Sequence, residues 1–305
     1  MSTSEQLAAK LKGHSIFREL KDLSAVDPNA IEAFYPNVRD RNDVGVLRCK
    51  TSGVIFLDSV DHVASSYYSE KAGTSYWSSE DRNTGLKETA EDDNRRAAQI
   101  KDLIKGKSYA DVGSGLGGIL DLVKPLAKDI VAVEPQKDIR ENLQHLGYDV
   151  HASISDLMNS GKKVDLITLF HVFEHITDPL NSLKMLHASL APGGKIFIEV
   201  PHAGDALITT YDLDAFKKFT FWSEHLVLHT KKSLEKYLAA AGFKNISVKG
   251  FQRYPLTNHL LWLRDGKPGG QNFYKKLREE KSEQAYAEML DKNDLTDTII
   301  GIAEK

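Results

Sequence analysis

The sequence predicts an α/β protein with a doubly wound, mostly parallel sheet. Two observations support this class: apolar, strand-like runs alternate with helix-periodic segments over residues 88–253, and a glycine cluster follows the first of those runs. Strands and helices that alternate in this way form right-handed crossovers, which cover both faces of a parallel sheet. The composition agrees, because 41% hydrophobic and 27% charged residues over 305 positions are ordinary for a globular chain.

The elements of this core follow one another along the chain. Acidic residues at 88–93 suit a helix N-terminus, where the helix dipole favours negative charge, and that helix ends at Gly106. Continuous apolar runs predict buried strands, and apolar residues three or four positions apart predict helices. We expect strands at 109–112, 130–133, 164–170, 195–200 and 245–251, and further helices at 119–126, 139–146, 178–190 and 232–241.

The chain divides into three predicted segments. Residues 1–87 form an N-terminal addition, residues 88–253 form the core, and residues 254–305 complete it. The N-terminal addition contains one strand-like run at 53–57 and an aromatic-rich stretch at 63–77. Because tyrosine and tryptophan serve both roles, that stretch is either a surface helix with a loop or a lid over a ligand.

The C-terminal segment begins with an insertion at 254–270, which we expect to be a long loop. Loops of this length are usually functional or disordered. The insertion carries Tyr254, Asn258, His259 and Trp262, which suit either a sugar acceptor or a subunit contact. A charged helix at 275–290 and a final strand at 297–302 follow.

Composition and charge exclude several classes of function. With 40 basic and 43 acidic residues the net charge is −3, so the chain lacks the basic footprint of a nucleic-acid-binding protein. Its single cysteine, Cys49, forms neither an internal disulfide nor a cysteine-rich zinc site. The sequence has no apolar run of the roughly 18 residues that a membrane span needs, and no signal-peptide segment. We therefore expect a cytoplasmic protein that binds no nucleic acid.

A glycine-rich turn follows the first core strand. Gly113, Gly115 and Gly118 have the spacing of the dinucleotide-binding fingerprint, and such a turn binds its ligand beyond the carboxyl ends of the strands. Glu134 ends the second strand and suits the ribose of either a nicotinamide or an S-adenosylmethionine cofactor. Asp111 distinguishes between these two cofactors, because its carboxylate would repel the pyrophosphate of a nicotinamide dinucleotide and favour an ammonium or sulfonium ligand. The turn therefore favours S-adenosylmethionine.

Four motifs in order resemble the class I S-adenosylmethionine-dependent methyltransferases. They lie at 111–117, 134–135, 170–175 and 190–201. The segment at 221–229 is similar to the Glu-His-Leu segment of bacterial sugar methyltransferases. The resemblance implies a seven-stranded Rossmann-like sheet whose last strand is inserted antiparallel near the edge. It also implies methyl transfer to a small polar acceptor: a sugar, a nucleotide-sugar or a surface-glycan intermediate.

The resemblance further implies a set of cofactor-binding residues around the glycine turn and the strand ends. The alternative for the glycines is a purely structural tight turn. The implied contacts are Asp111 for the amino group, Gly113, Gly115 and Gly117 for the methionyl and ribose portions, Glu134 for the ribose, Gln136 for the adenine, and Phe170 with His171 for the floor of the site.

Histidines are the candidate proton acceptors. A hydroxyl or carbon acceptor must lose a proton during methyl transfer, and histidine titrates near neutrality. His225 is the first candidate, with Glu224 or a neighbouring carboxylate to orient it; the alternative is a histidine satisfied in a packed loop. The reserve candidates are His171, His202, His229 and Tyr211.

Other readings stay open. Glu199, near the end of a buried strand, is either a site carboxylate or the partner of a backbone donor. His175 is either a helix-start residue bonded to the backbone or a catalytic residue. No histidine and carboxylate group has dedicated ligand spacing, so we expect no metal. The alternative functions are an NAD(P)-dependent oxidoreductase and a non-catalytic cofactor-binding protein, and a homo-oligomer is also open.

Overall fold

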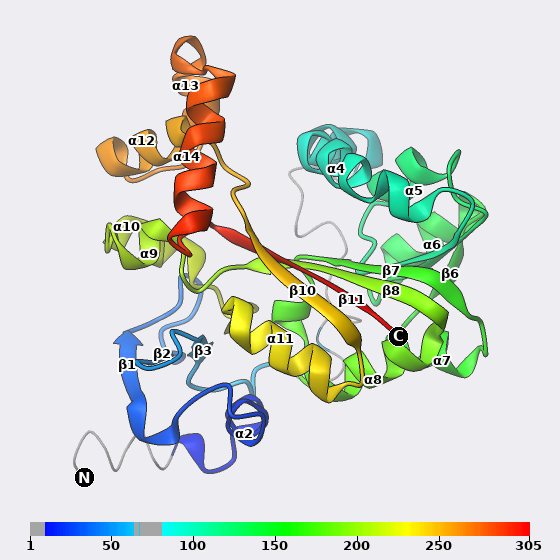
Figure 1. Ribbon diagram of the computed structural model, residues 1–305, viewed down its shortest axis with the longest axis horizontal. Coiled ribbons are helices and arrows are strands. Elements are labelled where there is room, and N and C mark those ends of the chain that lie inside the picture. The colour runs from blue at the N-terminus through cyan, green and yellow to red at the C-terminus, as the bar shows by residue number, and fades with distance from the viewer. Residues whose placement is uncertain (1–9, 64–66, 68–80) are drawn as a thin grey trace.

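The computed structural model describes residues 10–63, 67 and 81–305, and a seven-stranded sheet forms its main body (Figure 1). The strands are β4 (Ser108–Val112), β5 (Asp129–Val133), β6 (Asp149–His151), β7 (Val164–Phe170), β8 (Leu190–Pro201), β10 (Lys244–Phe251) and β11 (Thr298–Glu304). Their order is β10-β11-β8-β7-β4-β5-β6, and neighbours from β8 to β6 are parallel. The predicted doubly wound, mostly parallel sheet is confirmed.

Helices cover both faces of this sheet. They are α4 (Arg82–Ile104), α5 (Gly118–Val123), α6 (Lys137–His145), α7 (Ile154–Asn159), α8 (Pro179–Ser189) and α11 (Lys231–Ala240). Figure 1 shows α4 and α5 on one side of the sheet and α8 and α11 on the other. Helix α4 begins earlier than the acidic stretch predicts, because the Asp81 side chain caps it by accepting a hydrogen bond from Thr84 N.

Strand β11 lies inside the sheet and runs antiparallel to both of its neighbours. Ile299 is opposite Val200 of β8 on one side and Gly250 of β10 on the other. Ile299 and Ala303 are buried, as expected for a strand that is covered by helices and flanked by strands. The expected antiparallel insertion of the C-terminal strand is therefore confirmed.

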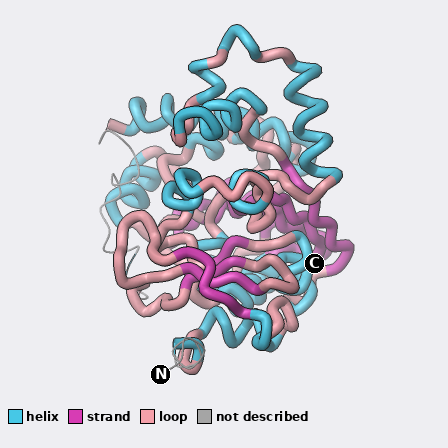
Figure 2. Tube along the Cα trace, turned by 90° about the vertical axis from the view of Figure 1, so that its left-hand side faces the viewer, coloured by secondary structure: helices cyan, strands magenta, loops and turns pink. Residues whose placement is uncertain are grey.

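A second, smaller sheet joins the N-terminal region to the middle of the chain. Its strands are β1 (Ile31–Tyr35), β2 (Val46–Cys49), β3 (Ile55–Leu57) and β9 (Val227–Leu228), all antiparallel and in this order. The helices α2 (Ser15–Asp22) and η1 (Pro28–Ala30) precede β1. This sheet faces the viewer in Figure 2. Because β9 belongs to the 221–229 segment, the N-terminal strands support the part of the chain that carries His225.

The remaining helices follow the strands β7, β8 and β10 along the chain. They are η3 (Phe173–His175), α9 (Ala206–Thr209), α10 (Asp214–Thr220), α12 (Leu256–Asp265), α13 (Gly270–Phe273), η4 (Lys275–Leu277) and α14 (Glu280–Lys292). The expectation of a long loop at 254–270 is wrong, because α12 forms there and buries Leu261 and Trp262. The apolar run in the insertion was the sequence signal for this helix. A helix of this length is stable only when its apolar side packs against the rest of the protein.

Two further expectations concern the N-terminal region. The possible lid at 63–77 lies outside the described residues, except for Val63 and Tyr67. Within the described ranges, no helix is both long enough and apolar enough to cross a membrane.

Candidate functional site

A cavity of about 710 Å³ opens at the carboxyl ends of the parallel strands. Segments that follow β4, β5, β6, β7 and β8 line it, together with α10, α12 and residues around His225. Ligands of doubly wound sheets bind at this edge, because the strand ends and helix N-termini converge there. The cavity is therefore the candidate site.

The glycine turn packs closely against the segment after β7 and is bonded to Glu134. Gly113 has φ +74°, and a Cβ at this position would come within 2.4 Å of Val172 Cγ2. Gly115 N donates a 2.9 Å hydrogen bond to Glu134 Oε2, and Gln136 N donates a 2.9 Å hydrogen bond to Glu134 Oε1. Burial raises the pKa of Glu134, and these two backbone bonds oppose that effect. The carboxylate is thus held rigidly, and each of its oxygens can accept a further bond.

Gln136 provides a test of whether S-adenosylmethionine suits this end of the cavity. Its Oε1 is buried and accepts no hydrogen bond within the described structure, and the residue lines the cavity. A buried acceptor of this kind costs free energy unless a ligand donates to it. An adenine amino group is such a donor, so Gln136, Glu134 and the glycine turn fit the cofactor that the resemblance implies.

The remaining predicted cofactor residues divide into two groups. Phe170 and His171 line the cavity, as expected for its floor. Asp111 and Gly117 lie outside the cavity lining. The Asp111 carboxylate accepts a 2.6 Å bond from the Thr168 hydroxyl, and burial raises its pKa to about 7. Asp111 therefore supports the turn from behind in this structure, and its contact with an amino group stays a prediction.

Glu199 is the centre of a buried ion-pair network. It is 0% exposed, and Arg95 donates two bonds to its carboxylate, at 2.7 and 2.8 Å. Arg96 Nε and His171 Nε2 lie 3.3 Å from the same carboxylate. Burial opposes ionisation, but Arg95, His171 and Arg96 outweigh it and lower the pKa of Glu199 well below its usual range. The expectation that Glu199 bonds a backbone donor is wrong, since arginines of α4 hold it.

Asp92 extends the same network to Arg253. Asp92 forms ion pairs with Arg95, at 3.0 Å, and with Arg253, which lines the cavity. Burial opposes ionisation of Asp92, but Arg253 and the α4 arginines lower its pKa to about 2. Alternating charges therefore connect α4, the end of β8 and the segment after β10.

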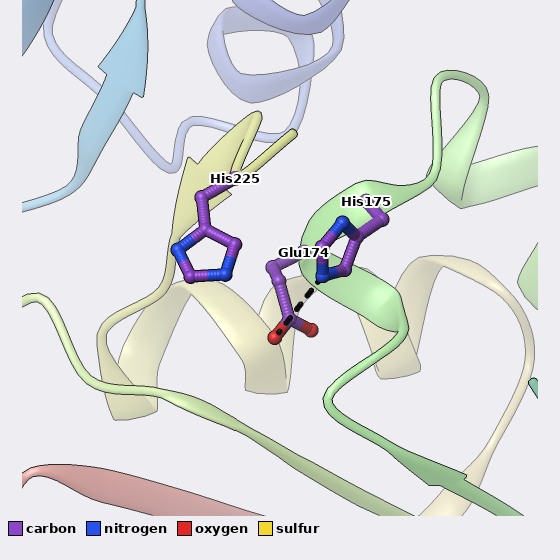
Figure 3. A group of neighbouring side chains, drawn as sticks. All are labelled: Glu174, His175 and His225. Carbon is purple, nitrogen blue, oxygen red and sulfur yellow. Dashed lines mark ion pairs between the residues drawn. The ribbon is translucent and has the colours of Figure 1, made fainter. Parts of the chain in front are cut away.

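Of the two expectations for His225, Glu224 or a neighbouring carboxylate, the structure places the second beside the ring. Glu224 is buried and accepts a 2.9 Å bond from the Tyr67 hydroxyl. Glu174 instead lies beside His225, and ligand atoms of Glu174, His175 and His225 all lie within 4.8 Å of one another (Figure 3). The 170–175 run after the fourth strand was the available sequence signal for Glu174.

The ring of His225 is oriented by the backbone. Its Nδ1 lies 3.1 Å from the carbonyl oxygen of Thr220, and because a carbonyl only accepts, Nδ1 carries the proton. Its Nε2 therefore bears the lone pair. Burial, assisted by His175, lowers the pKa of His225 to about 4, so the ring is neutral at pH 7.

The reserve candidates are placed differently. His171 bridges two buried carboxylates, with Nδ1 3.3 Å from Glu174 Oε1 and Nε2 3.3 Å from Glu199 Oε1. His202 lines the cavity, and its Nδ1 lies 2.9 Å from the Thr296 carbonyl oxygen. His229 and Tyr211 are absent from the lining; His229 is buried and its ring stacks on Phe173.

Aromatic rings form the other half of the cavity. Phe216, Phe219, Trp222 and Trp262 line it, and the Trp262 ring lies 5.1 Å from that of Phe216 and 5.2 Å from that of Phe219. Such rings offer flat apolar faces to another ring. This half therefore suits a ring-shaped acceptor.

Two polar residues of the insertion bond within the protein. Asn258 Oδ1 accepts a 3.0 Å bond from Gly269 N, and a second bond from Gly270 N. His259 Nδ1 lies 2.8 Å from the Tyr286 hydroxyl. These partners hold α12 against α13 and α14, so fewer polar groups remain for the acceptor than the sequence predicts.

Comparison with known proteins gives consistent matches to methyltransferases. Residues 79–248 match the family model described as a methyltransferase domain. A ubiquinone biosynthesis O-methyltransferase from Haemophilus ducreyi is 31% identical over 183 residues, which cover 52% of this chain and 73% of the relative. The corresponding protein from Coxiella burnetii is 27% identical over 179 residues, 53% of this chain and 74% of the relative.

A tRNA relative and one solved structure complete the comparison. A tRNA U34 carboxymethyltransferase from Campylobacter hominis is 28% identical over 155 residues, 48% of this chain and 53% of the relative. The structure of a complex between the Haloferax volcanii Trm112 methyltransferase activator and a methyltransferase matches with a TM-score of 0.51. It covers 77% of this chain and 98% of that chain at 12% identity, which supports the fold alone.

Proposed function

The chain belongs to the methyltransferase domain family that its residues 79–248 match, and from this premise we propose that it methylates a hydroxyl oxygen on a small, ring-shaped acceptor. The family makes the chain an S-adenosylmethionine-dependent enzyme, so the nicotinamide-dependent and the non-catalytic alternatives are not retained. One observation carries the proposal: the glycine turn, the aromatic half, His175 and His225 line a single cavity.

The residues at the glycine turn have the binding role. Bound S-adenosylmethionine would supply a methyl group on its sulfonium, and Gly113, Gly115, Glu134 and Gln136 would hold it. Methyl transfer is an in-line displacement, so the protein mainly aligns the acceptor and excludes water. The buried network around Glu199 keeps the floor at His171 in place.

The proton of the acceptor hydroxyl leaves at the group formed by Glu174, His175 and His225. His175 and His225 line the cavity, and His225 Nε2 is available as an acceptor because Nδ1 is bonded to Thr220. An imidazole with a pKa of about 4 is a weak base on its own, because proton transfer is efficient when the pKa lies near the working pH. The group as a whole is therefore the unit that activates the acceptor.

An aromatic hydroxyl fits the acceptor half best. Phe216, Phe219, Trp222 and Trp262 present apolar faces, while Asn258 and His259 are bonded within the protein. Two relatives are named O-methyltransferases of ubiquinone biosynthesis, which supports oxygen as the methylated atom.

A sugar hydroxyl is the second candidate. The resemblance of the 221–229 segment to sugar methyltransferases favours it, and sugar rings also stack on tryptophan and phenylalanine. This candidate covers the sugar, nucleotide-sugar and surface-glycan acceptors. The Asn258 amide oxygen, which is bonded to Gly269 and Gly270, would contribute less to such an acceptor than the sequence predicts.

The test measures S-adenosylhomocysteine formation with three acceptor panels: catechols and phenols, sugars and nucleotide-sugars, and unmodified tRNA. We expect turnover with the first panel. His225→Asn should lower kcat by about 10²- to 10⁴-fold with nearly unchanged cofactor affinity, whereas His145→Asn on the exposed face of α6 should change neither. Turnover with tRNA alone, or a His225→Asn variant of wild-type rate, would contradict the proposal.

A further inference from the structure

Two histidines and one glutamate converge at the cavity from distant parts of the chain. Glu174 and His175 lie in η3 directly after β7, and His225 lies in the loop before β9. Their three ligand atoms lie within 4.8 Å of one another, and in the described part of the chain no second group of histidine, cysteine and carboxylate ligands meets this spacing (Figure 3). Both histidines line the cavity.

Glu174 is the residue of this group whose buried carboxylate a bound cation would stabilise. Its side chain is 0% exposed, and neither carboxylate oxygen accepts a hydrogen bond in the described structure. The nearest basic side chains are the imidazoles of His171, whose Nδ1 lies 3.3 Å from Oε1, and of His175, whose Nε2 lies 3.8 Å from Oε1. A buried carboxylate is costly unless it is paired, hydrogen-bonded or bound to a metal.

His225 has the arrangement of a metal-ligating histidine. Ligand imidazoles usually donate their second ring N–H to a carbonyl or carboxylate, which fixes the tautomer and directs the lone pair at the ion. His225 donates Nδ1–H to the Thr220 carbonyl, and Figure 3 shows its other nitrogen on the side of Glu174. His171 contacts both carboxylates and so connects Glu174 to Glu199.

We propose that Glu174, His175 and His225 bind a divalent transition-metal ion of the zinc class. Imidazole nitrogens with one carboxylate favour such ions over Mg²⁺ and Ca²⁺, which prefer oxygen ligands throughout. With Glu174 buried and only His175 and His225 facing the cavity, three protein ligands would leave a coordination position open toward the cavity, as in catalytic zinc sites. Ligands that share one ion at about 2.0–2.1 Å stand roughly 3.4 Å apart in a tetrahedral site. Small side-chain rotations would bring the three atoms to this distance.

The ion specifies how the proposed hydroxyl methylation proceeds, and this step rests on that function. With the ion bound, His225 Nε2 would be a metal ligand and not the base, and coordination of the acceptor oxygen would lower the pKa of its hydroxyl. The hydroxyl proton passes to solvent, the oxygen lone pair forms the new bond to the methyl carbon, and the carbon–sulfur bond of the sulfonium breaks. The ion is unchanged in charge, so no oxidant or reductant is needed.

Metal binding is tested directly with tag-free protein stripped by a chelator and titrated calorimetrically with Zn²⁺ and Co²⁺. We expect one ion per chain and a Co²⁺ visible spectrum of nitrogen and oxygen ligation. His225→Ala and Glu174→Gln should weaken metal binding by more than the roughly 10- to 100-fold caused by replacing a residue that only hydrogen-bonds to a metal ligand. His145→Ala, at an exposed histidine of α6, is the matched control and should bind normally.

Several results would overturn the inference. These are no binding by the wild-type protein, binding that His225→Ala leaves unchanged, or full methyl transfer by the stripped enzyme with chelator present. The last result would leave the proposed hydroxyl methylation intact, with His225 as the base. Conversely, metal binding that His225→Ala abolishes, with no oxygen acceptor methylated, would retain the site and reject the function. If Glu174→Gln does not fold, the His225→Ala comparison and the Zn²⁺-induced rise in the melting temperature of the wild type decide.

Discussion

Replacing Glu134 by glutamine tests the cofactor end of the cavity most directly. The carboxylate accepts backbone bonds from Gly115 and Gln136, one on each oxygen, and each oxygen can accept one more. In Glu134→Gln, one charged acceptor becomes an amide nitrogen that cannot accept. A hydrogen bond to a charged group contributes about 1.5 to 3 kcal/mol, so S-adenosylmethionine should bind about 10- to 150-fold more weakly.

The substitution also affects the turn itself. The amide nitrogen would face either Gly115 N or Gln136 N, which leaves one buried donor without an acceptor. This costs about 1 to 3 kcal/mol of unfolding free energy, measured by urea denaturation in the absence of cofactor.

Calorimetry with S-adenosylmethionine and S-adenosylhomocysteine measures the affinity, and circular dichroism confirms that the variant is folded at the assay temperature. Glu141→Gln, an exposed position on α6, is the matched control and should bind normally. A dissociation constant within twofold of wild type for folded Glu134→Gln would refute the assignment of Glu134 to the ribose.

Three further predictions concern stability, the sheet and the acceptor. Burial lowers the pKa of His229 and His259 to about 4 in the folded protein. In the unfolded chain their pKa is near 6.5, so between pH 6.5 and pH 4 only the unfolded chain takes up these protons. The free energy of unfolding should therefore fall as the pH decreases from 6.5 towards 4. At pH 5 this amounts to as much as about 2 kcal/mol for each histidine, and equal urea midpoints at pH 7 and pH 5 would argue against it. Truncation after residue 296 removes β11 from between β8 and β10 and should give insoluble protein; a soluble, cofactor-binding product would contradict this. Phe219→Ala should raise the acceptor KM while Phe273→Ala, outside the cavity, does not, and equal KM values would remove the aromatic half from acceptor binding.

Much of the core was predictable because its signals are local. The strand at β7, the helix start at Asp178-Pro179 and the glycine turn each depend on a few neighbouring residues. Glu134 was found for the same reason, since it ends a strand at a fixed distance from the turn.

Other features depended on context that local patterns do not carry. Helix α12 was expected as a loop, because an isolated helix of this length is marginal in water and forms here only against α13 and α14. Likewise, β1 and β2 are short strands that are stable only when paired with each other and β3.

The sequence by itself determined the fold class, the position of the glycine turn and the position of Glu134 directly after a strand, because periodicity and turn chemistry act over a few residues. Only the tertiary structure decided which charges meet. Arg95 of α4 bonds Glu199 of β8, which lies 104 residues further along the chain. Glu174 of η3 lies close to His225, which precedes β9. Such pairings follow from how the sheet orders its strands and from how β9 joins the N-terminal sheet, and no spacing along the chain encodes them.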